Sequence, residues 1–62
     1  MKSSEFHRSI TRSKKKKWWY VEAEGSHYIY EDENGIRYPV PFHGAKEIAE
    51  PLRKRIVRDM GI

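Results

Sequence analysis

The residues best suited to chemistry in this 62-residue chain form the tripeptide Gly25-Ser26-His27. The runs Trp18–Glu24 and His27–Tyr30 are rich in aromatic and β-branched residues, which predicts two strands joined by a tight turn at Gly25-Ser26. Histidine can both give and take a proton near neutral pH. At an exposed turn between basic segments it suits acid–base chemistry on a polyanion. A histidine at the start of a strand can equally be a plain surface or packing residue.

Period-two alternation decides which way this histidine points. In the second strand Tyr28 and Tyr30 share one face, and His27 and Ile29 share the other. If the tyrosines pack inward, His27 points outward, as a reactive side chain must. The first strand has two sets of residues on its two faces: Trp18 with Tyr20, and Trp19 with Val21 and Ala23.

Two helices and a third strand complete the predicted order. The spacing of Phe6 and Ile10 predicts a short helix over residues 4–12, capped by Ser3 or Ser4. The chain then turns at Asn34-Gly35, a dipeptide that tolerates positive φ at both positions, into a third strand over 36–40. Within that strand Pro39 has no N–H to donate, which predicts an edge position or a proline nitrogen that faces away from its neighbour.

A second helix is expected over residues 51–60, with Pro51 in its first turn and Gly61 at its end. A separate turn is expected over 45–49. The apolar stripe recurs every four residues, at Ile48, Leu52, Ile56 and Met60.

The order helix, three antiparallel strands, helix predicts an α+β fold with both helices on one sheet face, in a single domain spanning residues 1–62. This layout resembles the double-stranded RNA-binding domain and leaves the other sheet face open. So short a chain has a marginal core, so a stabilising partner is expected.

Composition narrows the class of protein. The chain has no cysteine, which excludes disulfides and thiolate chemistry. No apolar run approaches the roughly 20 residues of a membrane span, and no secretory signal is recognisable, so we expect a soluble protein of the cytoplasm. Five carboxylates and no lysine or arginine occupy residues 22–35, whereas the flanking segments are basic. If the flanking segments meet in space, they form a basic face suited to a phosphate backbone.

Four consecutive lysines, Lys14, Lys15, Lys16 and Lys17, precede the first strand. They are interpreted as a solvated loop or charged strand edge, as a phosphate-contacting loop, or as a nuclear-import signal. His43, in the loop after the third strand, is expected to fix that loop through a backbone hydrogen bond. Lys54 and Arg58 are expected to project from the second helix toward solvent, a polyanion or a protein.

The chain resembles the HicA-type toxins of HicA–HicB toxin–antitoxin pairs, also described as YcfA-like mRNA interferases. The resemblance covers nearly the whole length. It is carried by an ordered set of segments: the opening Met1-Lys2-Ser3-Ser4-Glu5, the aromatic strand, Gly25-Ser26-His27, the hairpin, Val40-Pro41-Phe42-His43, and the ending that runs from Pro51 to Ile62.

The resemblance implies a toxin that cuts mRNA without a metal or other cofactor, with a fold similar to a double-stranded RNA-binding domain. It implies a HicB-type antitoxin that covers the active face. The catalytic histidine of the family corresponds to His27, with Gly25 and Ser26 shaping the turn, while Pro41, Phe42 and His43 match a structural motif. This chain departs from the common family pattern in two places. Many members have a basic residue at the position of Glu22 and a Gln-Lys pair at the positions of Ala23-Glu24. Many also have a shorter linker in place of Lys14–Lys17.

RNA cleavage needs no cofactor if the 2′-hydroxyl attacks the adjacent phosphate. We expect His27 to act as base or acid, a lysine from Lys14–Lys17 or Lys46 to stabilise the developing charge, and Ser26 or water to complete proton transfer. His27, Lys54 and Arg58 are expected to face the antitoxin. The alternatives are a non-catalytic RNA- or DNA-binding module, and an enzyme in which His27 and His43 share acid and base roles.

Overall fold

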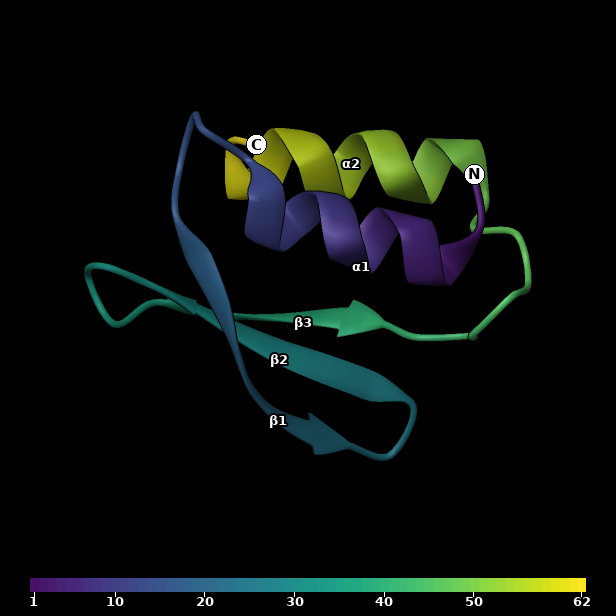
Figure 1. The fold of residues 1–62 in the computed structure, drawn as a ribbon, viewed down its shortest axis with the longest axis horizontal. Helices are drawn as coiled ribbons and strands as arrows, with labels where there is room; N and C mark the ends of the chain where they lie inside the picture. Colours follow the sequence, from purple (N-terminus) through teal and green to yellow (C-terminus); the bar gives the residue numbers. More distant parts are fainter.

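The computed structural model describes residues 1–62. Its elements are, in order, α1 (Ser3–Arg12), β1 (Trp18–Glu24), β2 (His27–Asp32), β3 (Arg37–Pro41) and α2 (Glu50–Met60). The strands form one antiparallel sheet in the order β1-β2-β3, and both helices lie on one face of it (Figure 1). The predicted α+β class and α-β-β-β-α order are confirmed. The second face of the sheet has no helix over it.

The core fills the space between the helices and the sheet. Its eight buried side chains come from every element and from the loop before α2: Phe6, Ile10, Trp18, Tyr30, Val40, Ile48, Ile56 and Met60. The indole Nε1–H of Trp18 donates to the Met60 carbonyl oxygen at 3.0 Å, which ties the start of β1 to the end of α2. The predicted apolar stripe of α2 is wrong at Leu52, which is exposed, whereas Val57 packs against the core.

A β-bulge in β1 changes the predicted faces. Tyr20 pairs with Tyr30, but the next pair is Glu22 with Ile29, so Val21 is the extra residue. Beyond the bulge the alternation is reversed, and Ala23 therefore lies on the same sheet face as Tyr20 rather than opposite to it. The prediction that Ala23 shares a face with Trp19 was wrong for this reason.

The two hairpin turns use glycine differently from one another. Gly25 has φ +59° and Ser26 has no positive φ, as in a two-residue type II′ turn, which confirms the predicted tight link. In the second turn Gly35 alone has a positive φ, of +78°, so the expectation for Asn34 was wrong. The carboxylate of Asp32 instead accepts the N–H groups of Asn34 and Ile36, both at 2.9 Å, and extends β2 two residues beyond its predicted end.

The start of α1 is held by a distant loop. Lys2 is the N-cap and makes no side-chain capping bond, so the expected serine cap was wrong. The N–H groups of Ser3 and Ser4 donate to the carbonyl oxygens of Lys46 and Gly44, at 2.8 and 2.9 Å. These backbone bonds satisfy donors that a cap would otherwise serve.

β3 is an edge strand, as Pro39 predicted, and it runs one residue later than expected. The separate turn expected over 45–49 lies earlier, at 44–45, where the Lys46 N–H donates to the His43 carbonyl oxygen at 3.1 Å; Glu47 then makes a β-bridge with Lys2. α2 then begins at Glu50, with Pro51 in its first turn, and ends at Gly61 with φ +70°. Neither helix has the length and apolar character that crossing a membrane requires.

Candidate active site

His27 lies at the first position of β2 on the uncovered face of the sheet. Its cross-strand partners are Glu24 in β1 and Pro41 in β3, so these three residues form one row across the sheet. Directly opposed residues project to the same face, with Cβ atoms about 5 Å apart. His27 and Glu24 are both exposed. The expectation that His27 points away from the tyrosines is confirmed, because Tyr30 is buried on the helical side.

The uncovered face is acidic around the histidine. The next row consists of Glu22, Ile29 and Pro39, and the third consists of Trp19, Glu31 and Arg37. Arg37 is occupied by Glu31, at 3.1 Å between Nε and Oε1. The two carboxylates nearest to His27 are therefore those of Glu24, directly across, and Glu22, on the diagonal.

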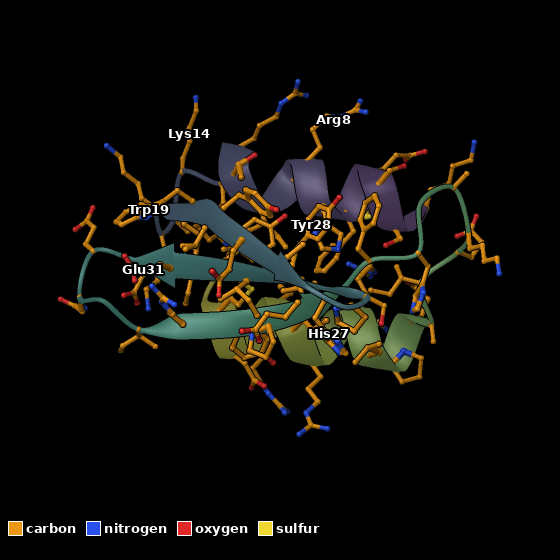
Figure 2. The ribbon with its side chains drawn as sticks, turned by 90° about the horizontal axis from the view of Figure 1, so that it is seen from below. Arg8, Lys14, Trp19, His27, Tyr28 and Glu31 are labelled. Carbon is orange, nitrogen blue, oxygen red and sulfur yellow. The ribbon has the colours of Figure 1, made fainter.

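The four lysines lie at the opposite end of the sheet from His27. They precede Trp18, which pairs with Asp32 at the far end of β2, while Glu24 pairs with His27 at the near end. The seven residues of β1 rise about 3.3 Å each, which separates its ends by roughly 20 Å. In Figure 2 Lys14 lies at the upper left, and His27 lies below and to the right of it, well separated from it. The structure thus does not bring Lys14–Lys17 to the phosphate that His27 would contact.

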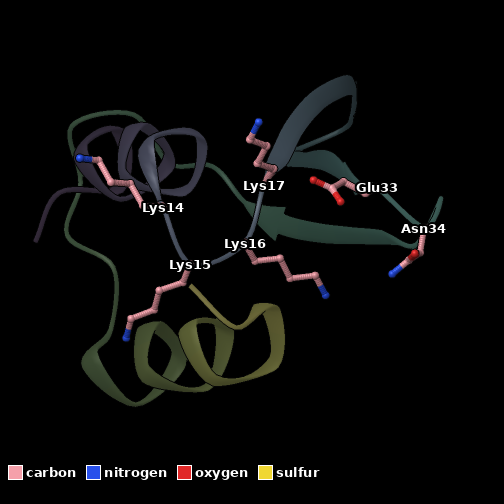
Figure 3. Close-up of a pocket in the computed structure, with 6 residues that line it drawn as sticks. All are labelled: Lys14, Lys15, Lys16, Lys17, Glu33 and Asn34. Carbon is pink, nitrogen blue, oxygen red and sulfur yellow. The ribbon is translucent and has the colours of Figure 1, made fainter.

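The lysines line a shallow cavity of about 270 Å³ together with Glu33 and Asn34. Their side chains point in different directions rather than toward one point (Figure 3). Lys16 has a structural partner: its Nζ lies 3.1 Å from Oδ2 of Asp32, which is 1% exposed, and 5.0 Å from the centre of the Trp18 ring.

The carboxyl of Asp32 has a pKa below its usual value. Burial alone would raise the pKa, but the Ile36 N–H, the Lys16 ammonium and the Asn34 N–H outweigh it by stabilising the charged form. Lys16 therefore has a structural role: it stabilises the Asp32 carboxylate that organises the turn after β2.

The remaining candidates are distributed over both layers. The backbone carbonyl of Ser26 accepts the Phe42 N–H at 2.7 Å, which fastens the Gly25-Ser26 turn to the segment after β3. Lys46 is exposed in that same segment, which leaves the sheet at the end where His27 lies (Figure 1). Lys54 and Arg58 are exposed on α2, in the helical layer, whereas His27 is on the uncovered sheet face.

His43 contributes its backbone to the loop. Its N–H donates to the hydroxyl of Ser3 at 3.0 Å, and its carbonyl oxygen accepts the Lys46 N–H at 3.1 Å. The predicted loop-fixing role is therefore played by the main chain, and the imidazole is left exposed.

A third histidine, His7, was not identified as a candidate from the sequence. It is 5% exposed, and its two ring nitrogens lie 2.7 Å from the Tyr30 hydroxyl and from the Pro41 carbonyl oxygen. The signal was available, because residues 3, 6, 7 and 10 follow the i, i+3, i+4, i+7 pattern of a buried helix face. The chain contains no group of three or more His, Asp or Glu side chains arranged to hold a metal ion.

Comparison with known proteins gives one result. A family model described as "HicA toxin of bacterial toxin-antitoxin" matches residues 10–62, a range that contains the Gly25-Ser26-His27 motif and all three strands. No curated protein and no solved structure matches the chain. Because the matched range covers most of the sequence and includes the exposed histidine, the chain belongs to the HicA toxin family.

Proposed function

We propose that the chain is an endoribonuclease that cleaves mRNA in the cytoplasm and that His27 transfers a proton in the reaction. Membership of a toxin family supports a role as the toxin of a toxin–antitoxin pair. The observation that carries the nuclease proposal is the exposed imidazole of His27 at the turn of the uncovered sheet face. An extended RNA strand can approach such a face without first opening the fold.

The proposed reaction is an intramolecular transesterification. A base takes the proton of the 2′-hydroxyl, the 2′-oxygen attacks the neighbouring phosphorus, and the bond from phosphorus to the 5′-oxygen breaks. An acid gives its proton to the leaving 5′-oxygen. The products are a 2′,3′-cyclic phosphate and a 5′-hydroxyl, and no metal takes part in any step.

One imidazole can hold only one of these roles at a time, so a second group is needed. Glu24 fits this need, because it faces the same side of the sheet directly across from His27. In this assignment the carboxylate of Glu24 accepts the 2′-proton, and protonated His27 supplies the proton to the 5′-oxygen. Of the lysines expected to stabilise the phosphorane, Lys46 is in the better location, since Lys14–Lys17 lie at the other end of β1.

The test is cleavage of a labelled transcript by the wild type, His27→Ala and the control His43→Ala. General acid or base catalysis accounts for about 100- to 10,000-fold in rate, so His27→Ala is expected to lose at least about 100-fold. His43→Ala should cleave nearly as fast as the wild type, and a chelator should have no effect. Equal rates for the wild type and His27→Ala would refute the assignment. A large loss in His43→Ala would favour two cooperating histidines.

The second candidate is a module that binds RNA or DNA without cutting it. It is favoured by the exposed cations of the helical layer, on the side of the sheet away from His27: Arg8, Arg12, Lys54, Arg55 and Arg58. Contacts from such residues to phosphates release counterions, so the affinity would fall steeply with added salt. An intact transcript with retarded migration, with no fragments, supports this candidate over the enzyme.

We further propose a HicB-type antitoxin as the partner, with the uncovered face around His27 as the surface that it must cover. Lys54 and Arg58 are in the other layer, so a partner seated flat on the uncovered face would leave them free. A partner that binds only the folded chain raises its melting temperature. The expected result is therefore a complex that melts well above the free chain; identical melting temperatures would argue against the pairing.

A further inference from the structure

His7 in α1 is a buried histidine that the proposed reaction does not use. It lies outside the residues that the family model matches. Its Nδ1 is 2.7 Å from the Tyr30 hydroxyl and its Nε2 is 2.7 Å from the Pro41 carbonyl oxygen. Three further aromatic contacts surround the ring, with Tyr28, Tyr30 and Phe42 at centroid distances of 5.1, 5.6 and 5.0 Å. The ring has little contact with solvent, so water does not readily replace these partners.

The partners fix which nitrogen carries the proton. A carbonyl oxygen can only accept, so Nε2–H donates to Pro41, and in the neutral ring Nδ1 then accepts the Tyr30 O–H. Burial, with the neighbouring Tyr28 and Tyr20, raises the pKa of Tyr30 to about 12, so this hydroxyl keeps its proton. The pKa of His7 is lowered by burial, and further by the nearby His43, although the bond to Pro41 opposes the shift.

One of the two residues bonded to His7, Pro41, is a direct neighbour of His27. Pro41 is its cross-strand partner in β3. The next residue, Phe42, donates its N–H to the Ser26 carbonyl at 2.7 Å and stacks on the ring of Tyr28 at 4.3 Å with an interplanar angle of 10°. Ser26 and Tyr28 are the residues on either side of His27 along the chain. The His7 contacts therefore hold the strand beside His27 and, through Phe42, both of its sequence neighbours.

We propose that His7 is a positioning residue for His27, and that protonation of the His7 ring at Nδ1 removes the acceptor of the Tyr30 O–H, loosens the packing of the ring beside His27 and lowers the activity of the site. The inference depends on the nuclease function proposed above. A protonated ring would have two donors and no acceptor, so the Tyr30 O–H would lose its partner in a buried location. The titratable groups around the ring are Tyr28 and Tyr30 from β2 and His43 from the loop after β3.

Two substitutions separate the bonding from the shape of the ring. His7→Phe keeps an aromatic ring of similar size and loses both hydrogen bonds. His7→Gln keeps one donor and one acceptor but gains no proton in mildly acidic solution. Glu5→Gln, at another exposed position of α1, is the matched control.

The readouts are kcat and KM for a labelled oligoribonucleotide as a function of pH, and hydrogen exchange of the Phe42 amide. A displacement of about 1 Å at a catalytic group can cost about 100-fold in rate, so His7→Phe is expected to lower kcat by about 10- to 100-fold, with KM little changed. The Phe42 amide should exchange faster in this variant. His7→Gln should keep much of the activity and lose part of the decline that the wild type shows on acidification.

Several outcomes would overturn the positioning role. Unchanged kcat and unchanged Phe42 exchange in His7→Phe would do so, as would an acid decline in His7→Gln identical to that of the wild type. If His7→Phe does not fold, the pH profiles of the wild type and His7→Gln decide. If the wild type cleaves no RNA, the nuclease proposal fails by itself, and the exchange of the Phe42 amide still reports whether His7 holds the segment beside His27.

Discussion

The two cross-strand neighbours of His27 differ in their chemistry: one has a side chain that can accept a proton, and the other does not. Glu24 in β1 presents a carboxylate, whereas Pro41 in β3 presents only a ring and a carbonyl that is already occupied by His7. A proton can therefore be accepted on the β1 side of His27 but not on the β3 side. In the proposed reaction, a phosphate bound over His27 would have its proton acceptor, Glu24, on the β1 side.

Glu24→Gln is therefore expected to slow RNA cleavage by about 100-fold or more, because an amide of the same size cannot accept the proton. The matched control is Glu22→Gln, one row further along the same face and opposite Ile29, which should cleave at nearly the wild-type rate. Single-turnover rates at saturating protein measure this. Similar rates in the two variants would show that Glu24 is not the acceptor and would leave water or Ser26 in that role.

At the scale of single elements, the lysine-rich loop is a structural connection as well as a basic segment. Lys16 joins the loop to Asp32 at the end of β2, and the Asp32 carboxylate also organises the turn that follows through Asn34 and Ile36. The loop thereby connects α1 to the second hairpin. The other three lysines are exposed, so only one of the four is committed to the fold.

Lys16→Met is expected to lower the melting temperature more than Lys15→Met, since it leaves the buried Asp32 carboxylate without its cation while keeping an apolar stem over Trp18. Thermal unfolding followed by circular dichroism at neutral pH measures the difference. If both variants melt together, the contact between Lys16 and Asp32 does not stabilise the fold. If Lys16→Met melts lower, as expected, adding Asp32→Asn to it should recover part of the loss, because the unpaired buried charge is removed.

The elements themselves could be predicted from the sequence because their signals are local. Strand alternation gave the direction of His27, and Pro51 and Gly61 bounded α2 to within one residue. The failures arose where a distant segment supplied the partner. The start of α1 takes its hydrogen-bond acceptors from residues 44–46, and the bulge at Val21 is visible only in the pairing of β1 with β2. The helical spacing indicated that His7 is buried, but its bonding partners could not be predicted, because they are 23 and 34 residues away.

At the scale of the whole molecule, the charges are sorted by layer. The helices and the lysine loop carry most of the cations, and the uncovered sheet face carries Glu22, Glu24 and Glu31. The sequence showed this division along the chain, and the expectation that the basic segments meet is consistent with two helices on one side. It did not show that the histidine would be on the acidic side, since that depends on the stacking of the layers.

The stability of the whole chain is expected to fall in two stages on acidification. The pKa of His7 is lower in the folded chain than in the unfolded chain. The contribution of neutral His7 to the free energy of unfolding is therefore complete above pH 6.5 and is lost as the pH falls through the lowered pKa. One proton limits the slope to about 1.4 kcal/mol per pH unit. The lowered pKa of Asp32 places the second stage below about pH 3.8. Urea unfolding at a series of pH values measures both, and the first stage should be absent in His7→Gln.

A three-stranded sheet has two edge strands, here β1 and β3, and the row of main-chain hydrogen-bonding groups is interrupted in each of them. Val21 bulges from β1, and Pro39 and Pro41 remove two N–H donors from the short β3. A neighbouring polypeptide therefore finds no uninterrupted ladder of main-chain groups to extend. These interruptions disfavour the edge-to-edge pairing of copies of the chain that leads to fibrils.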